Sequence, residues 1–503
     1  MIREFKKKYI FNLLGVSIVG FWLVMMTLLV RDNILNDNPS IKMNGTETAA
    51  ISSDQREWKE IFLNNKKVGY SVSMIKPFEG GYFIQEEIFL KMNLMGFEKG
   101  LYAITQSSVD GNFILKNFFF KMSSGIINYR VFGNVEGNKI IVRTGRGRRR
   151  RGRTIELKEP PMINSGIGYL FKTYKLNVGD SHKLPFFDPS LMAQNEAIFT
   201  IAAREDIKIN KINYEAFRVE TEMWGNRLSF WIDRDGSVLK EEGFMGLVMI
   251  KSSAANAPMN IETGNEDDFY ELSAVPVDKK IPSPDRLKSI RLRIKDAQQL
   301  DMDLSTLNDG TRQTYNNDII EIIREEEPLK AGFTLPFNSD DREFRPYLVP
   351  EFNIESDEKE IVDRAFDIIG DSREPVSCSR KIMEWVYRNL EKRPVVNVPS
   401  ALEIIHSKAG DCNEHATLLT ALLRAAGIPA RICVGLVYTR NKFFYHAWTE
   451  AYVGEWITMD ATLNQMPVDV SHVRLIRGAL DKQVEIIGVI GKLKLEVIDF
   501  EYN

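Results

Sequence analysis

The chain of 503 residues is long enough for roughly two to four domains, and its 44% hydrophobic and 27% charged residues are typical of globular proteins. The net charge of −3 gives no indication of a nucleic-acid partner. The three cysteines, Cys378, Cys412 and Cys433, are too few for a disulfide scaffold, and their odd number leaves at least one thiol free.

A membrane helix is the first element that the sequence predicts. Residues 9–30 carry no charged side chain, and a run of about 20 apolar residues crosses the hydrocarbon core as a helix. Basic residues at 3 and 6–8 precede this run, so the positive-inside rule places residues 1–8 in the cytoplasm. We therefore expect a single-pass protein of the bacterial cytoplasmic (inner) membrane, with the bulk of the chain periplasmic or extracellular.

A cleaved signal peptide is the alternative for the same segment. The apolar run is longer than the usual signal-peptide core of about 7–15 residues. In addition, no cleavage site of the A-x-A type follows closely after Val30. Both observations favour an anchor that is retained.

An antiparallel β domain is predicted at residues 54–250, after a polar linker at 31–53. Short stretches of alternating hydrophobicity follow one another there, separated by glycine turns. Hairpins are expected at 107–122, 130–143 and 228–242, because each contains a glycine turn between alternating apolar residues. Residues 251–345 contain two strand-like runs, at 289–294 and 318–323, and are expected to form a mixed β connector.

Helical patterns begin within residues 346–503, which are predicted to form the C-terminal domain. Apolar residues recur at helical spacing in 357–369, 376–390 and about 413–426, and the third helix ends at Gly427-Ile428-Pro429. Strands are expected at 430–439, 443–453 and 455–460, with a β-rich tail at 484–500. The expected fold class is therefore α+β, with an N-terminal transmembrane helix, a large antiparallel β-rich domain and a C-terminal domain of helices and strands.

Cys412 opens the third predicted helix, directly after Gly410 and Asp411. A helix N-terminus carries a partial positive charge and free N–H groups, which favour a thiolate and can stabilise an oxyanion. Gly410 would allow a backbone or a substrate to approach closely. A cysteine considered alone is more often a small buried hydrophobe than a nucleophile.

His446 and Asp460 are the partners that a nucleophilic thiol requires. His446 lies on a predicted strand, and Asp460 ends the next one. Each is usually structural when it stands alone, but a thiol needs a base, and the base needs a third group to fix its tautomer. A helix N-terminus packed on a hairpin can bring all three together.

The order of these motifs resembles the transglutaminase-like superfamily. Gly-Asp-Cys-x-x-His opens a helix, His-Ala-Trp lies on a strand, and Asp-Ala-Thr follows on the next strand. The resemblance covers residues 345–480 and implies a papain-like α+β core with Cys412 as nucleophile, His446 as general base and acid, and Asp460 as the orienting carboxylate. Many relatives have Asp-Pro where this chain has Asp460-Ala461, a difference that loses a turn constraint but no chemistry.

Other residues near the motifs have less specific interpretations. His415 packs on the helix or, as the alternative, joins Cys412, His446 and Asp460 as a zinc ligand, although no second cysteine is nearby. Asp411 is expected to cap the helix, and Cys433 to be inert core, because it lies in an apolar strand.

The arginine-rich segment from Arg146 to Arg153 is the strongest charge cluster of the sequence. Such a run is usually a solvated loop. On an extracytoplasmic domain it could instead contact an anionic polymer or lipid head groups.

These features together predict a membrane-anchored cysteine enzyme that acts on a protein or peptide amide through a thioester, with no cofactor and no bound metal. Water as the acceptor gives hydrolysis, as in a protease or amidase, and an amine gives transamidation; the resemblance favours hydrolysis. The alternative is a non-catalytic binding or assembly protein of the cell envelope that uses the β domain. A depressed pKa at Cys412 would favour the enzyme.

Strand pleating makes one geometric prediction about the triad. If the two strands pair as a hairpin, His446 and Asp460 share a face only when an odd-length loop or a bulge separates them. A three-residue loop at Val453-Gly454-Glu455 would pair Tyr452 with Trp456 and place Asp460 diagonally opposite His446.

Overall fold

The computed structural model describes residues 51–502 except 95–96, 125–126, 145–150, 168, 170–176, 224, 244–245, 263–270, 272, 301, 327, 329, 338–341, 394–399, 479–485 and 487–488. The helix expected at residues 9–30 and the tail at 1–8 lie outside this part of the chain. Within it, every helix is too short or too polar to cross a membrane.

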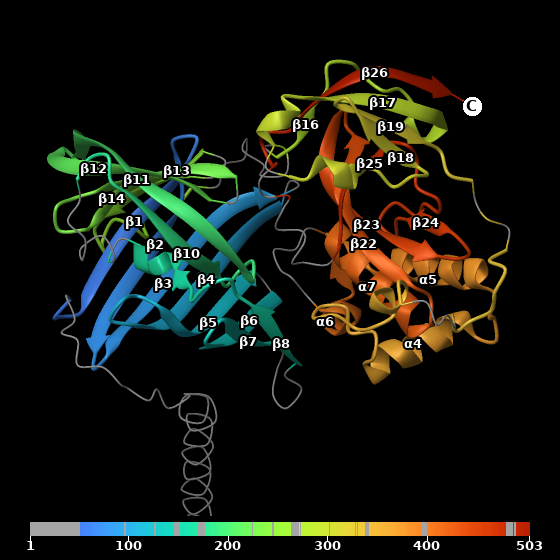
Figure 1. Ribbon diagram of the computed structural model, residues 1–503, viewed down its shortest axis with the longest axis horizontal. Coiled ribbons are helices and arrows are strands. Elements are labelled where there is room, and N and C mark those ends of the chain that lie inside the picture. The colour runs from blue at the N-terminus through green and yellow to red at the C-terminus, as the bar shows by residue number, and fades with distance from the viewer. Residues whose placement is uncertain are drawn as a thin grey trace, which may run out of the picture. The chain divides into compact units, whose positions relative to one another are not determined.

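The expected fold class is wrong for the described chain. Strands make up most of its regular structure, and the α-helices with defined bounds, α4–α7, lie between residues 359 and 425 (Figure 1). The described chain is therefore mostly β, not α+β with a transmembrane helix. The reason is that alternating hydrophobicity extends far beyond the predicted β domain, through the connector and into the C-terminal tail.

The N-terminal part of the described chain forms a sheet of 15 strands. Their bounds are β1 Gln55–Leu63, β2 Lys66–Phe78, β3 Gly81–Leu94, β4 Phe97–Asp110, β5 Leu115–Ser124, β6 Ile127–Glu136, β7 Lys139–Thr144, β8 Arg151–Glu156, β9 Met162–Ile163, β10 Ser181–Asp188, β11 Ala193–Ile209, β12 Ile212–Met223, β13 Asn226–Ile232, β14 Val238–Glu242 and β15 Leu247–Ser252. Strands β1–β8 and β10–β15 form two antiparallel meanders, which join where β1 pairs with β15, and β9 pairs parallel with β10.

The three expected hairpins are confirmed as β4–β5, β6–β7 and β13–β14. Gly137 and Gly236 adopt φ of 61° and 76° in two of the turns, a conformation that glycine reaches without strain. In the first hairpin, Asp110 Oδ1 accepts hydrogen bonds from the backbone of Asn112 and Ile114, and Phe113 takes the positive φ. The side chain of an aspartate thus stabilises the turn that its sequence predicts.

The sheet curls so that its two meanders share one hydrophobic core. The ring of Phe118 on β5 lies 5.4 Å from that of Phe187 on β10, and Phe199 on β11 packs on Phe230 of β13 at 6.3 Å. Because side chains alternate along each strand, the residues on the inner face are those that meet in this core.

The C-terminal part contains three further sheets and the helices α4–α7. Their bounds are β16 Val275–Pro276, β17 Leu287–Lys295, β18 Gln313–Asn316, β19 Ile319–Ile323, α4 Lys359–Ile369, α5 Pro375–Asn389, β20 Glu391–Lys392, α6 Ala401–Ser407, β21 Ala409–Gly410, α7 Cys412–Ala425, β22 Ala430–Thr439, β23 Lys442–Tyr452, β24 Trp456–Met459, β25 His472–Arg477 and β26 Lys494–Tyr502. Strands β16, β23, β22 and β25 form one sheet, with β24 also paired to β23. Strands β18, β19, β17 and β26 form the second, and β20 pairs with β21 in the third.

The predicted connector contributes strands to this C-terminal part. β17 pairs with β26 at the other end of the chain, and β16 pairs with β23. Residues from 275 to 497 share a single hydrophobic core. Sheet pairing therefore crosses the boundary expected at residues 345–346.

Helix α7 packs against β22 and β23 and lies within the shared core. It ends where Gly427 adopts a φ of 82°. A Cβ at this position would lie 2.6 Å from the ring of Pro336, so both the conformation and the space require glycine. The site described next is built on the opposite end of this helix.

Candidate active site

Cys412 is the first residue of α7, and Asp411 is its N-cap, as expected. The Asp411 carboxylate accepts a hydrogen bond from the Asn413 backbone at 3.0 Å, and Glu414 Oε2 accepts one from the Asp411 backbone at 2.8 Å. This capping box fixes the direction in which the chain enters the helix. The position of the thiol therefore depends on local contacts that the sequence itself encodes.

Gly410 is required by a close approach, although the group that approaches is not a substrate. A Cβ at residue 410 would lie 2.2 Å from Cβ of Glu414. The parallel pair β20–β21 places Gly410 beside Lys392 and holds the segment that precedes Cys412. The glycine thus makes room for the buried carboxyl side chain that completes the capping box.

His446 lies in the middle of β23, opposite Gly435 of β22. A Cβ at Gly435 would lie 2.0 Å from the carbonyl oxygen of Val473, so only glycine lets β25 pack there. The ring of His446 is buried, at 6% exposure. The packing of the sheet therefore fixes the orientation of the His446 ring, which has little freedom to rotate.

The predicted three-residue loop between β23 and β24 is confirmed. Tyr452 pairs with Trp456, and Gly454 between them adopts a φ of 105°. Thr449 pairs with Met459, so the register places Asp460 on the same face as His446. The loop length alone brings the two side chains together.

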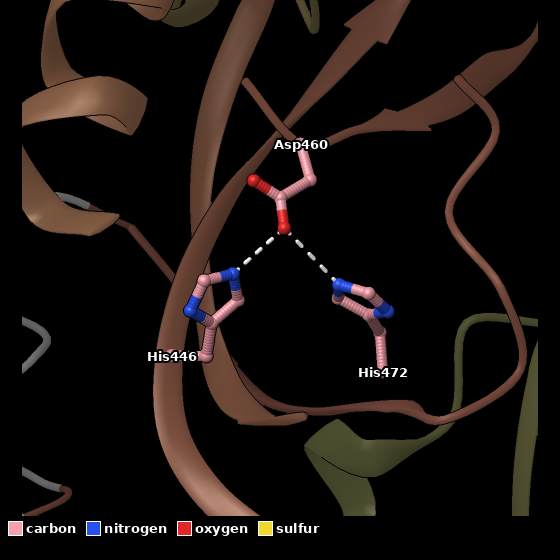
Figure 2. A group of neighbouring side chains, drawn as sticks. All are labelled: His446, Asp460 and His472. Atoms are coloured by element: carbon pink, nitrogen blue, oxygen red, sulfur yellow. Dashed lines mark hydrogen bonds and ion pairs between the residues drawn. The ribbon is translucent and has the colours of Figure 1, made fainter. Parts of the chain in front are cut away.

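His446 Nε2 lies 2.7 Å from Asp460 Oδ2, and the other ring nitrogen points away from Asp460 (Figure 2). The second carboxylate oxygen, Oδ1, accepts the backbone N–H groups of Thr462 at 2.6 Å and Leu463 at 3.1 Å. Asp460 is fully buried. Both oxygens are therefore held in place by donors.

The electrostatics of the pair favour a charged histidine. Burial raises the pKa of Asp460, but the charge and hydrogen bond of His446 outweigh it and hold that pKa well below its usual range. Burial likewise opposes protonation of His446, and the charge of Asp460 raises the ring pKa to about 10. The buried carboxylate thus stabilises the imidazolium that forms when His446 takes the proton of the thiol.

Cys412 lies within hydrogen-bonding reach of His446 and of the Ala447 backbone. Burial and the Asp411 carboxylate raise the pKa of the thiol above its usual value, while His446 lowers it. The depressed pKa that a helix N-terminus suggested is therefore not found. The capping carboxylate and the surrounding core offset the helix dipole.

His472 is a functional candidate that no sequence motif indicates. It begins β25, is fully buried, and places Nε2 3.2 Å from the same Oδ2 of Asp460 that His446 approaches (Figure 2). Its Nδ1 lies 3.3 Å from Asp469 Oδ1. One signal in the sequence is rarity, because the chain contains five histidines in all.

The residues around His472 raise the pKa of its ring in the same way. Burial opposes protonation of its ring, but hydrogen bonds to Asp460 and Asp469 raise its pKa. Burial raises the pKa of Asp469, and its hydrogen bond to His472 outweighs this and lowers it. Hydrogen bonds therefore link His446, Asp460, His472 and Asp469 in one chain, which begins beside Cys412.

The alternative set of zinc ligands does not assemble. His415 is buried, its Nδ1 lies 2.7 Å from the Asp411 carbonyl oxygen, and burial lowers its pKa, so it packs as a neutral ring. Among the described residues, three potential ligands converge at His446, Asp460 and His472, with ligand atoms within 4.8 Å of one another. The hydrogen bonds of both rings to one carboxylate oxygen account for this grouping.

The remaining candidates from the sequence lie apart from this site. Cys433 is fully buried in β22, where burial raises its pKa well above the usual value. Residues 145–150, which hold most of the arginine cluster, are outside the described residues. Arg151 and Arg153 belong to β8.

Comparison with known proteins assigns this part of the chain. Residues 363–461 match the transglutaminase-like superfamily. These residues form a transglutaminase-like domain. The match includes Cys412, His446 and Asp460 and ends at Ala461, so His472 lies beyond it. No curated protein matches the chain.

Solved structures resemble portions of the chain at low identity. A protein of Cytophaga hutchinsonii described as a candidate cysteine protease is 22% identical, with a TM-score of 0.29, over 38% of this chain and 76% of its own. The periplasmic domain of TgpA from Pseudomonas aeruginosa is 19% identical, with a TM-score of 0.21, over 31% and 64%. A β-barrel-like protein of Brucella abortus, from a family of unknown function, is 13% identical, with a TM-score of 0.31, over 40% and 96%.

Proposed function

We propose that the transglutaminase-like domain is a cysteine enzyme that cleaves or exchanges amide bonds of a protein or peptide. Cys412 is the nucleophile, His446 the general base and acid, and Asp460 the orienting carboxylate. The observation that supports this proposal most directly is the 2.7 Å contact between His446 and Asp460 beside a thiol at a helix N-terminus. Nucleophile, base and orienting group are thus adjacent, with His446 and Asp460 buried and Cys412 partly exposed to a substrate.

The first half-reaction forms a thioester. The sulfur of Cys412 attacks the carbonyl carbon of the amide while its proton passes to His446, whose positive charge Asp460 stabilises. The tetrahedral intermediate then collapses: the C–N bond breaks, and His446 returns the proton to the departing amine. The raised thiol pKa makes this proton transfer to the ring the step that generates the nucleophile.

The start of α7 is suited to stabilise the oxyanion of the tetrahedral intermediate. The first N–H groups of a helix have no partner in the preceding turn and carry a partial positive charge. Asn413 N–H is already bonded to Asp411, which leaves the Cys412 N–H as the group to donate to the oxyanion. The capping box fixes the start of α7 and with it the direction of the Cys412 N–H.

The second half-reaction decides between hydrolysis and transamidation. Water attacking the thioester releases an acid, and an amine releases a new amide; His446 removes the proton from either acceptor. We favour hydrolysis, and with it a protease or amidase. The side chains at the site serve both acceptors equally well, so the measured product assigns the reaction.

An acyl-enzyme experiment tests the proposal. The full chain is mixed with a peptide that has an activated C-terminal ester, quenched in acid, digested and examined by mass spectrometry. We expect the acyl group on Cys412 and none on Cys412→Ala, with labelling unchanged in Cys378→Ala, a matched loss of a buried thiol. Acylation of Cys412→Ala, or none of the wild type, would contradict the proposal and leave a non-catalytic binding role for the chain.

A further inference from the structure

A cavity of about 300 Å³ lies inside the curled sheet, far along the chain from Cys412. Its lining is charged on one side and apolar on the other. The charged residues are Glu57, Lys59, Glu86, Asp188 and Glu241. The cavity volume is at the lower end of the range for small-molecule sites.

Four carboxylates line this cavity beside a single cation, Lys59, whose charge acts on Glu57 and Glu86 but cannot balance them all. Lys59, the basic residue of the lining, pairs with Glu241, and Asp188 Oδ1 accepts hydrogen bonds from Ser190 and the Leu191 backbone. Glu57 and Glu86 make neither a hydrogen bond nor a salt bridge with any described residue. Carboxylates on the inner face of a sheet are costly unless something balances their charge.

Strand register places these two carboxylates in one row. Glu57 of β1 is directly opposite Ser73 of β2, and Ser73 is directly opposite Glu86 of β3. Two strand spacings separate the glutamates, about 10 Å, and the serine between them is small. Tyr169 OH lies 2.9 Å from Ser73 Oγ and closes the floor of the space between them.

The wall formed by β12–β14 is largely apolar. Met223, Leu228, Phe230 and Val238 line it together with Ile167, and Asn226 and Glu241 are its polar residues. A ligand that fits both walls needs a positive charge on one end and a hydrocarbon body on the other. Its donor N–H groups would bind the glutamates, which as carboxylates can only accept hydrogen bonds.

A metal ion fits this space poorly. Among the residues that the structure describes, three or more potential metal ligands converge only at His446, Asp460 and His472. The carboxylates of the cavity are therefore too far apart to enclose an ion. The apolar wall would also contribute nothing to binding an ion.

We propose that this cavity binds a small organic cation, with an ammonium or guanidinium group between Glu57 and Glu86 and an apolar body against Phe230 and its neighbours. The site is separate from the thiol and does not depend on the proposed reaction. Glu86 faces Lys59 and Glu57 of β1, Asp188 of β10 and Glu241 of β14, and burial raises its pKa to about 7. Cation binding should therefore weaken as the pH falls through 7, because protonation removes one of the two charges.

Calorimetry with the full chain and benzylamine tests the proposal, with benzyl alcohol as the neutral analogue of the same shape. We expect saturable benzylamine binding, at least tenfold weaker binding of the alcohol, and about tenfold weaker benzylamine binding at pH 6 than at pH 8. Glu57→Gln and Glu86→Gln should each weaken benzylamine binding by about tenfold. Glu87→Gln is the matched control, because Glu87 lies on the other face of β3, where Oε2 accepts a hydrogen bond from Tyr102.

Four results would overturn the proposal. They are no benzylamine binding, equal affinity for amine and alcohol, an equal loss in Glu87→Gln and Glu86→Gln, or displacement of benzylamine by calcium ions. The comparison of the two probes uses the wild-type chain, so it stands even if a variant folds poorly. Acylation of Cys412 is measured separately and is unaffected by any of these outcomes.

Discussion

His472 places its Nε2 3.2 Å from the Asp460 oxygen that lies 2.7 Å from His446. One carboxylate oxygen therefore contacts two buried imidazoles. Because Asp460 orients His446, a group that fixes the position of Asp460 also influences the orientation of His446 indirectly. We infer that His472 is a positioning residue for the proposed reaction.

Replacement of His472 tests this role through the pH dependence of the rate. Without His472, the charge on Asp460 acts on His446 alone, so the ring becomes more basic. We expect His472→Asn to lower kcat by about tenfold with little change in KM, and to move the acidic limb of the pH–rate profile to higher pH. His406→Asn, at an exposed histidine bonded to Glu360, is the control. A lower rate with an unshifted profile would leave His472 a purely structural role.

The proposed triad predicts a graded loss of activity. Cys412→Ala and His446→Ala should each reduce kcat by more than about a thousandfold, because nucleophile and base act as a unit. Asp460→Ala should leave more residual activity, because it orients the base and does not react. Steady-state rates on a peptide amide or ester measure this order, with circular dichroism to confirm folding. Full activity in Cys412→Ala would move the reaction to another site.

The conformation of Gly454 in the β23–β24 loop should affect the position of Asp460 and therefore activity. Its φ of 105° is strained for any other residue, and an added Cβ would lie 2.6 Å from the Ala331 carbonyl oxygen. Gly454→Ala should lower the free energy of unfolding by about 2 kcal/mol or more and reduce activity, because β24 carries Asp460 into place. Denaturant unfolding and rate assays measure both effects.

Gly491→Ala is the matched control for this loop. Gly491 has a positive φ of 78°, but an added Cβ would have no neighbour within 4 Å. Gly491→Ala should lower the free energy of unfolding by about 1 kcal/mol and leave the reaction rate unchanged. If the two variants behaved alike, the close contact at Gly454 would have no influence on the site.

The buried carboxylate of Glu450 should contribute a pH-dependent share of the free energy of unfolding. This carboxylate accepts hydrogen bonds from Arg431 at 2.6 Å and Arg477 at 2.9 Å. Burial raises its pKa, but the two arginines prevail and lower it to about 2, whereas the unfolded value is about 4.3. A depressed pKa stabilises the fold above the unfolded value, and this contribution is lost as the pH falls from about 4.3 to 2.

Glu450→Gln should therefore destabilise the chain by about 3–5 kcal/mol at pH 7, and the difference from wild type should shrink as the pH falls towards 2. Urea unfolding at several pH values measures this trend. Glu496→Gln, which removes an exposed pair with Arg293, should change stability by less than about 1 kcal/mol at every pH. A constant difference for Glu450→Gln across the pH range would contradict the assignment.

The sequence by itself determined the local parts of this site. The capping residue before Cys412, the helix end at Gly427 and the odd-length loop at Gly454 all follow from residues a few positions apart. Turn and cap chemistry depends on neighbouring backbone groups, so it can be inferred without knowing the rest of the fold. The hairpins of the β domain follow from the same kind of pattern.

Tertiary structure alone decided what distant segments bring together. His472 meets Asp460 only because β25 pairs with β22, and the row of Glu57, Ser73 and Glu86 exists only through the register of three strands. The pairing of β17 with β26 joins residues about 200 positions apart, which no periodicity reveals. Alternating hydrophobicity predicts that a strand has one face towards the core. The partner strand, and the residues that this face meets, depend on the packing of the whole chain.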